Sequence, residues 1–338
     1  MTSNRSKGAG QLMIGPFVIA LAAGAASALM FASIISGALI SLVLFYLAPL
    51  PLMVAAIAWG PLYAAIGGIA AAISLGALVS FPYCIAFAIA VALPAWWLGH
   101  LTLLGRPAAD HASNSALSPE DPAAALEWYP IGRILLWIAA VATLTTFAAL
   151  LTLGTDAATI TSTLHRALSR ILSASDSPVS ADTEQWIDTL INVAPAAAAL
   201  FATATLTLNL WLAAKIAATS GLLRRPWPDL RTVALPPLTV AALFAAIGLS
   251  FAGGLVAILA VITASTLLMA YALTGLAVLH TLSLRWSSRP LWLGLSYALI
   301  LTPVWPMLFC AMVMLGLADL VFGLRQRFWR RPPPLPVP

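Results

Sequence analysis

The hydrophobic positions of this chain come in long unbroken runs. Residues 8 to 105 include no Asp, Glu, Lys or Arg, and four more charge-free runs follow at 134–155, 189–214, 232–284 and 290–318. A helix needs about 20 apolar residues to cross a hydrocarbon core of about 30 Å, and each run reaches that length. A transmembrane barrel would instead show alternating segments of about ten residues. The pattern therefore predicts an all-α, polytopic transmembrane helical bundle.

Turn-forming residues divide the first run into a four-helix block at 14–105, with helices expected at 14–36, 39–58, 62–80 and 83–104. Pro49 and Pro51 fall inside the second helix, where each removes a backbone hydrogen bond and bends or breaks the helix. Because lipid cannot satisfy freed backbone groups, broken spans line a protein interior or a cavity. We therefore expect a cavity beside these two prolines.

The rest of the chain alternates polar and apolar segments. A short tail at 1–13 precedes the first block, and a polar linker at 106–130 leads to a second transmembrane block at 131–323. Within it, 155–190 is predicted to be interfacial, since Ile160, Leu164 and Leu168 fall at helical spacing opposite Arg166 and Arg170. The Arg- and Pro-rich tail at 324–338 is predicted to be disordered.

Composition agrees with a membrane protein. Hydrophobic residues make up 62% of the chain and charged residues 8%, against roughly 45 to 50% and 25% in ordinary globular domains. The net charge of +5 comes with no nucleic-acid recognition motif, so we assign the surplus to cytoplasmic loops. The predicted partner is the lipid bilayer and not a nucleic acid.

The basic residues indicate the topology. Of the 16 Lys and Arg residues, nine crossings would leave six outside, namely Arg166, Arg170, Arg325, Arg327, Arg330 and Arg331, whereas an even number brings the last four inside. We therefore predict about eight spanning helices plus a re-entrant or broken segment, with both termini cytoplasmic in a bacterial inner membrane. The last segment is the first candidate for re-entry, because 291–302 would rise only about 18 Å. The short segment at 234–250 is the second.

Asn209 is the most deeply placed strongly polar residue of the apolar runs. An amide in lipid needs a partner, which is either another helix or a ligand. Trp211 lies two residues further along the same run and could line a cavity. Asn209, Trp211, Pro49 and Pro51 are therefore the candidate ligand-binding residues.

Four ionisable residues lie near the ends of apolar segments and form a second candidate group: Lys215, His280, Asp319 and Arg325. Snorkelling to the interface explains such terminal positions. Asp319 is followed closely by Arg325, so the two could form an ion pair within the chain or orient a partner. We treat the group as interface or ion-pair residues.

Motifs that carry chemistry are absent from the sequence. It contains no HExxH zinc site, no GxSxG nucleophile elbow and no P-loop. No His, Cys and carboxylate group has metal-ligand spacing. The sequence therefore predicts a protein that is not an enzyme, with no catalytic residue, no metal site and no cofactor.

Several segments together resemble the YybS-like family of predicted bacterial membrane proteins, a domain of unknown function (DUF2232). They are FYLAPLP at 45–51, PAWWLG at 94–99, and the stretches 127–133, 209–216, 225–231, 275–280 and 316–319 with Arg325. That family is similar in apolar organisation to the substrate-binding subunits of energy-coupling-factor vitamin transporters. The resemblance implies a helical bundle that captures a small molecule and docks onto a membrane partner through a face of small residues.

Two functions follow as expectations. The first is a small-molecule, vitamin-like substrate-binding or transport subunit, with an unidentified ligand held near the broken second span. The alternative is a non-enzymatic scaffold or assembly protein of the bacterial cell envelope, which the basic inner loops favour. A stable membrane-protein partner would distinguish the second from the first.

Overall fold

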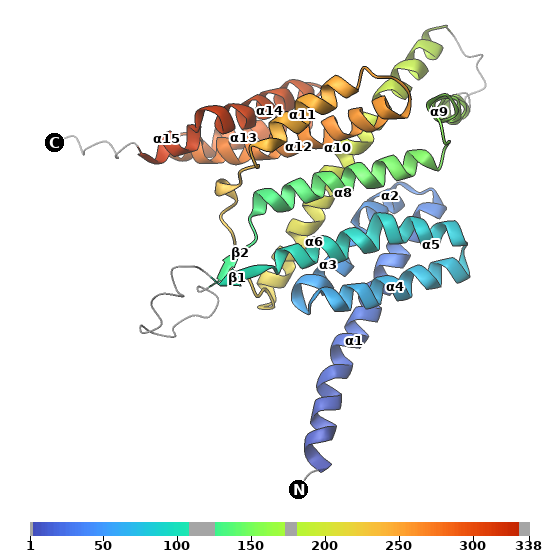
Figure 1. Ribbon diagram of the computed structural model, residues 1–338, viewed down its shortest axis with the longest axis vertical. Helices are drawn as coiled ribbons and strands as arrows, with labels where there is room; N and C mark the ends of the chain where they lie inside the picture. The colour runs from blue at the N-terminus through green and yellow to red at the C-terminus, as the bar shows by residue number, and fades with distance from the viewer. Residues whose placement is uncertain (1–2, 108–125, 173–180, 331–338) are drawn as a thin grey trace, which may run out of the picture. The chain divides into compact units, whose positions relative to one another are not determined.

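The computed structural model describes residues 3–107, 126–172 and 181–330, and its chain forms two compact units (Figure 1). Unit 1 comprises Met1–Pro130 and Ala204–Trp227, and unit 2 comprises Ile131–Thr203 and Pro228–Pro338. These units differ from the two predicted transmembrane blocks in one element, because residues 204–227 of the second block pack with the first. That element is α10 (Ala181–Thr219), a 39-residue helix that rises about 58 Å.

Unit 1 consists mainly of the four spans that the sequence predicts. The first span is α1 (Ser3–Ala32) with a 3₁₀ turn at Ser33–Ser36, and the third is α4 (Pro61–Leu78). The second and fourth spans are each made of two helices: α2 (Leu39–Leu47) with α3 (Pro49–Ala58), and α5 (Phe81–Phe87) with α6 (Leu93–Thr102). The α10 residues from Ala204 onward complete the unit.

Small residues bring α1 and α4 into backbone contact. A Cβ atom built on Gly24 would lie 2.2 Å from the carbonyl oxygen of Gly67, and one on Gly67 would lie 2.1 Å from that of Ala20. Such approach is possible only for glycine, and it is how helices pack in lipid without a hydrophobic driving force. This small-residue face of α1 therefore serves packing within unit 1.

The polar linker begins and ends in a short antiparallel pair that the sequence did not predict. Strand β1 (Gly105–Pro107) pairs with β2 (Leu126–Trp128), so that Arg106 faces Glu127. Their side chains form an exposed ion pair at 2.8 Å. The linker between the two strands lies outside the described residues.

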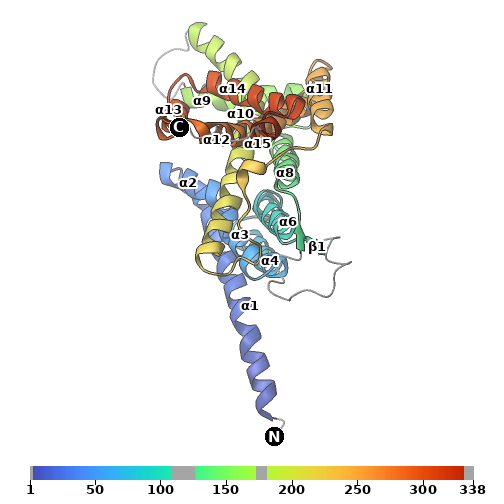
Figure 2. The same cartoon turned by 90° about the vertical axis from the view of Figure 1, so that its left-hand side faces the viewer.

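Unit 2 is built around α12 (Gly254–Leu282). Packed against it are α8 (Ile131–Leu151), α11 (Leu238–Leu249) and α14 (Trp305–Phe322). Figures 1 and 2 both show α14 beside α12. The core of the unit includes Leu135, Leu243, Leu267, Tyr271 and Val313. The remaining elements are α9 (Ala157–Leu172), the start of α10, 3₁₀ turns at Leu230–Thr232 and Ser283–Arg285, α13 (Arg289–Ile300) and α15 (Leu324–Arg330).

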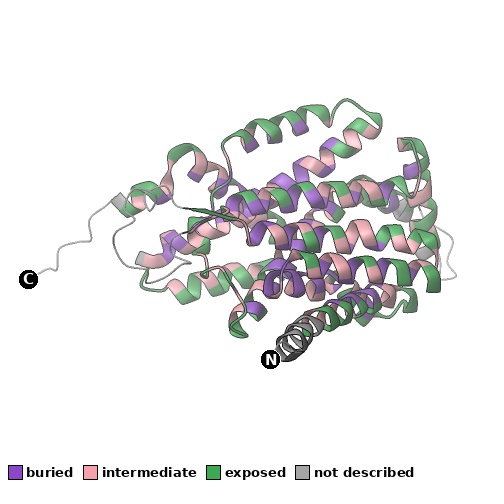
Figure 3. Ribbon diagram, turned by 60° about the horizontal axis from the view of Figure 1, so that its bottom comes forward, coloured by how far each residue is buried: buried purple, intermediate pink, exposed green. Residues whose placement is uncertain are grey.

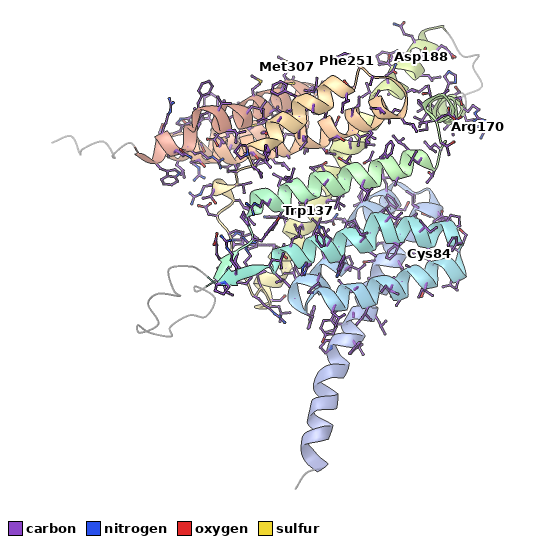
Figure 4. All side chains as sticks on the ribbon, viewed as in Figure 1. Cys84, Trp137, Arg170, Asp188, Phe251 and Met307 are labelled. Carbon is purple, nitrogen blue, oxygen red and sulfur yellow. The ribbon has the colours of Figure 1, made fainter. Side chains whose placement is uncertain are left out.

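The long helices turn many apolar side chains outward. In Figure 3 each of them carries both buried and exposed residues along its length. Phe251 and Met307, labelled in Figure 4, are 85% and 72% exposed. A water-soluble protein rarely exposes so much contiguous apolar surface, whereas lipid chains cover it without cost.

Eight helices among the described residues are long and apolar enough to cross a membrane, as predicted. The two short helices, α11 and α13, have 12 residues each and rise only about 18 Å. The last segment, predicted to be re-entrant or broken, is broken: it consists of α13 and the separate 18-residue α14. A sharp bend at Leu301–Val304 separates them, next to Pro303 and Pro306.

The direction of these helices follows from their contacts. Arg325, just after α14, donates hydrogen bonds to carbonyls that precede α11, and Thr239, at the start of α11, contacts Tyr271 in the second half of α12. The ends of α12 and α14 therefore lie on the same side of unit 2. It follows that α11 and α13 both run in the opposite direction.

The predicted amphipathic helix exists as α9. Its apolar side packs on protein: Ile160 is fully buried with Leu150 and Ile262, and Leu164 lies against the same cluster. Its opposite side carries the exposed Arg166 and Arg170. Part of the apolar face that the sequence assigned to the membrane interface is therefore covered by α8 and α12.

Asp156 caps α9, and we expect this cap to fail in acid. Its carboxylate accepts hydrogen bonds from the backbone N–H and the hydroxyl of Thr159 at 2.9 and 2.6 Å. These bonds hold the pKa of Asp156 below its ordinary value of 3.8, so the stabilisation is present above that pH and is lost as pH falls through the lower, folded pKa. Hydrogen exchange of the first α9 amides should accelerate in this range, and Asp156→Asn should remove the pH dependence. Unchanged protection in wild-type protein below pH 3.8 would contradict the assignment.

The C-terminal tail corrects one prediction. Disorder was expected from residue 324 onward, but Leu324–Arg330 form α15. Gly323 ends α14 in the left-handed conformation, with its N–H donating to the Asp319 carbonyl at 2.8 Å, and Arg325 is anchored directly after it. The residues from 331 onward lie outside the described part of the chain.

Candidate functional site

The second span is interrupted at one residue where the sequence predicts a bend or break: Ala48 lies between α2 and α3 and keeps helical dihedral angles, with φ of −54° and ψ of −34°. Helix α2 ends at Leu47, and α3 begins at Pro49, which has no N–H to donate to Phe45. The Phe45 carbonyl instead accepts a hydrogen bond from Ala48 at 3.2 Å. Pro51 likewise leaves Leu47 without its usual helical donor. Pro49 is buried and Pro51 half-buried, so this interruption lies inside the protein.

Asn209 lies against this break. Its side chain is fully buried, and its amide nitrogen donates to the carbonyls of Tyr46 and Thr205 at 2.8 and 3.0 Å. Both amide hydrogens are thus used, one of them to join α10 to the end of α2. The carbonyl oxygen Oδ1, also buried, has no hydrogen-bond partner among the described residues.

The fourth span contains a second interruption. A π-helical turn at Ala88–Ala92 separates α5 from α6, just before Pro94. Phe31 of α1 contacts both Phe45, next to the break, and Phe87, next to the π turn, with ring centroids 5.2 and 5.5 Å apart. The sequence prediction missed this turn, although Pro94 was a signal, because a proline inside a helix removes a backbone donor and distorts the helix. Such π turns are frequent at functional sites.

Hydrogen-bond acceptors and aromatic rings occur on neighbouring elements of unit 1, since Asn209 is bonded to Tyr46 and Phe45 contacts Phe31. The acceptors are Asn209 Oδ1 and the proline-disrupted backbone of the second span, and the rings belong to Phe31, Phe45 and Phe87. We name this set the girdle site. Its chemistry fits a group that donates hydrogen bonds and stacks on rings, because buried acceptors need donors.

Trp211 does not join the girdle site. Two residues on a helix differ by about 200° in direction, so Asn209 and Trp211 point to opposite sides of α10. The Trp211 side chain is 42% exposed, while Asn209 has no exposed surface. Pro49 and Pro51 shape the site through the backbone and offer no polar side-chain atom.

Asp319 and Arg325 form a buried ion pair in unit 2, as the sequence allowed. Their exposed fractions are 9% and 8%. Arg325 donates from Nη2 and Nε to Asp319 Oδ2 at 2.6 and 2.9 Å, and its backbone N–H donates to Oδ1 at 2.9 Å. Its Nη1 donates to the carbonyls of Arg231 and Val233 at 2.6 and 2.8 Å. Both charges are therefore paired and hydrogen-bonded, the condition for burying them.

A small cavity adjoins the pair. Its volume is about 10 Å³, room for a single water molecule. Tyr271, Thr274, Gly316, Asp319 and Arg325 are among its lining residues. Ala234, Leu235 and Leu320 complete the lining. The space is too small for an organic ligand.

Lys215 and His280 lie elsewhere. The Lys215 ammonium lies 5.2 Å from the ring centroid of Trp227 in unit 1. In unit 2, His280 contacts the Leu276 carbonyl at 2.8 Å through Nδ1 and the Tyr297 hydroxyl at 3.4 Å through Nε2. Both are local contacts, and no cluster of three or more His, Cys, Asp or Glu side chains that could hold a metal occurs among the described residues.

Comparison with known proteins places the chain in a family. Neither a curated protein nor a solved structure matches it, so the similarity to energy-coupling-factor subunits stays a prediction. One family model, described as a predicted membrane protein, matches residues 25–320. Together with the eight candidate spanning helices, this match supports a multi-pass membrane protein in contact with the lipid bilayer. The chain belongs to the DUF2232 family of predicted membrane proteins.

Proposed function

We propose that this protein is a non-enzymatic subunit that binds a small, vitamin-like molecule in the bacterial inner membrane. The observation that carries the proposal is the fully buried Oδ1 atom of Asn209, which lacks a partner at a proline break. Leaving a buried acceptor unpaired costs about 1 to 3 kcal/mol. A ligand that donates a hydrogen bond would remove this cost.

The girdle site indicates a class of ligand. Acceptors without donors favour a ligand with N–H groups, and the rings of Phe31, Phe45 and Phe87 favour a flat ring system that packs against them. A nitrogen heterocycle with ring N–H groups has both properties. Broken helices at mid-membrane depth are also where membrane transport proteins hold substrates.

The orientation belongs to the same proposal. Each of α11 and α13 is too short to span alone, but with its flanking loops it returns the chain to the side where the next long helix begins. Together with the eight longer spans the chain then makes ten passes, an even number. With the N-terminus inside, Arg166 and Arg170 are then the two external basic residues, and the other Lys and Arg residues are cytoplasmic. This is the asymmetry that the positive-inside rule favours. Both termini are therefore cytoplasmic in our proposal.

Asn209 provides the test of ligand binding. We expect a nitrogen heterocycle to raise the melting temperature of the purified wild-type protein in detergent, because binding to the folded state stabilises it. Asn209→Ala should need at least ten times more ligand for the same shift, which corresponds to a loss of about 1.4 kcal/mol in binding free energy. The matched control is Asn192→Ala, an exposed asparagine on the same helix, and it should bind as wild type.

Two results would end this proposal. One is a panel of heterocycles, vitamins and amino acids in which nothing shifts the wild-type melting temperature. The other is a ligand whose shift is equal in wild-type, Asn209→Ala and Asn192→Ala proteins, since binding would then be elsewhere.

An envelope scaffold is the second candidate, favoured by the anchoring of α15. The Arg325 network fixes this helix against Arg231 and Val233, and Arg327 on it is exposed. A fixed basic helix at the end of unit 2 suits an acidic protein partner. A partner that co-purifies in mild detergent and is lost in Arg327→Glu would support this candidate, and the absence of any partner would count against it.

A further inference from the structure

The chain leaves α10 through a compact basic segment in unit 1. Gly221 takes a left-handed conformation with φ of 68°, and the backbone N–H groups of Leu222 and Leu223 both donate to the Ala217 carbonyl. This turn closes the helix end and fixes the start of the segment that follows. Arg224, Arg225 and Trp227 come directly after it.

Arg225 is held in an unusual state. Its side chain is half-buried, and its Nη1 atom is enclosed without a hydrogen-bond partner among the described residues. Burial lowers the pKa of the Arg225 guanidinium, and no carboxylate opposes that effect. An enclosed cationic N–H without an acceptor is costly, and it is satisfied best by an anion.

The neighbouring residues add positive charge and an aromatic ring. Lys215 is exposed, with its ammonium 5.2 Å from the Trp227 ring centroid, and Trp227 is 43% exposed. Neither Lys215, Arg224 nor Arg225 forms an ion pair within the described part of the chain. The next acid along the chain, Asp229, is bonded to Arg231 at 2.9 Å.

We propose that this segment binds the phosphate of an anionic phospholipid headgroup, with Arg225 as the central ligand and Lys215 and Arg224 beside it. Guanidinium groups bind phosphate through paired, charge-assisted hydrogen bonds. A lipid is favoured over free phosphate because the segment follows the end of a spanning helix and carries Trp227, and tryptophan favours the membrane interface. Clusters of Lys and Arg at the cytoplasmic end of a membrane helix attract anionic phospholipid.

The test measures lipid-dependent melting of the full chain in a neutral detergent. Phosphatidylglycerol should raise the melting temperature of wild-type protein, while phosphatidylcholine should not. Arg225→Gln should need roughly ten times more phosphatidylglycerol, or more, for the same rise in melting temperature, as expected for loss of a charged hydrogen bond. Arg225→Lys should retain part of it, which keeps the test usable if Arg225→Gln does not fold.

Controls separate this site from general charge effects. Arg166→Gln removes an exposed basic residue from α9 in unit 2 and should respond to phosphatidylglycerol as wild type. The proposal is overturned if Arg225→Gln and Arg225→Lys both respond like wild type, or if phosphatidylcholine stabilises as strongly as phosphatidylglycerol. Equal stabilisation by inorganic phosphate at the same concentration would assign the site to a free anion and would overturn the lipid assignment.

Discussion

Replacing Arg325 by alanine is expected to lower the free energy of unfolding by about 3 to 5 kcal/mol, the usual cost of breaking a buried ion pair. The variant leaves the Asp319 carboxylate buried and removes the donors to the Arg231 and Val233 carbonyls. It should also free α15 from its position. Unfolding by denaturant in a mild detergent measures the loss.

The matched control for this change is Arg327→Ala. Arg327 lies on the same short helix, two residues away, but is exposed. Exposed charges contribute little, so the control should stay within about 0.5 kcal/mol of wild type. A similar loss of unfolding free energy in both variants would assign the stabilisation to the helix α15 as a whole and not to the buried network. A wild-type stability for Arg325→Ala would contradict the network itself.

Replacing Gly275 by alanine should destabilise unit 2 by about 3 kcal/mol, at the upper end of overpacking effects. A Cβ atom there would lie 1.8 Å from the Met312 carbonyl oxygen and 3.1 Å from the Gly316 nitrogen. Since backbone atoms cannot rotate away, α12 and α14 would have to separate. That separation would loosen the core around Tyr271 and Val313.

Gly248→Ala is the control for helix propensity. Gly248 lies inside α11, and a Cβ atom built on it would meet nothing within 4 Å. Alanine in such a position should be neutral or stabilise by up to about 1 kcal/mol. The unfolding curve of Gly275→Ala should therefore move to lower denaturant concentration, whereas that of Gly248→Ala should stay in place or move to higher concentration. Equal destabilisation would contradict the close approach of α12 and α14.

Much of the fold could be predicted because long apolar runs have few alternatives in lipid. Backbone groups must be paired internally, so runs such as 131–153 become helices whatever their exact residues. Pro49 and Pro51 located the break for a similar reason, since a missing N–H is a property of the residue itself. Eight spans and the break in the second one were thus readable from local chemistry.

What could not be predicted depends on contacts between distant residues. The tail looked disordered because it is rich in Arg and Pro, yet Arg325 donates hydrogen bonds to Arg231 and Val233, which lie far away in sequence. The apolar side of α9 looked suited to lipid, but part of it packs on Ile262. The opposite directions of α13 and α14 likewise could not be predicted, because they follow from contacts between residues far apart in the sequence.

The candidate site was predicted in part. Asn209 and the proline break do meet, which a single polar residue in an apolar helix made foreseeable. Trp211 was grouped with Asn209 by closeness in sequence, although helical periodicity places them on opposite faces. The π turn at Ala88–Ala92 was missed because Pro94 was not considered as a disruption of the fourth span.

The most direct test of the girdle site is an experimental structure of the purified full-length protein. The proposed function predicts non-protein density within hydrogen-bond distance of Asn209 Oδ1, between the break at Ala48 and the π turn at Ala88–Ala92, with the density absent in Asn209→Ala. A structure in which a protein donor satisfies Oδ1 and packed side chains fill the same space would contradict it.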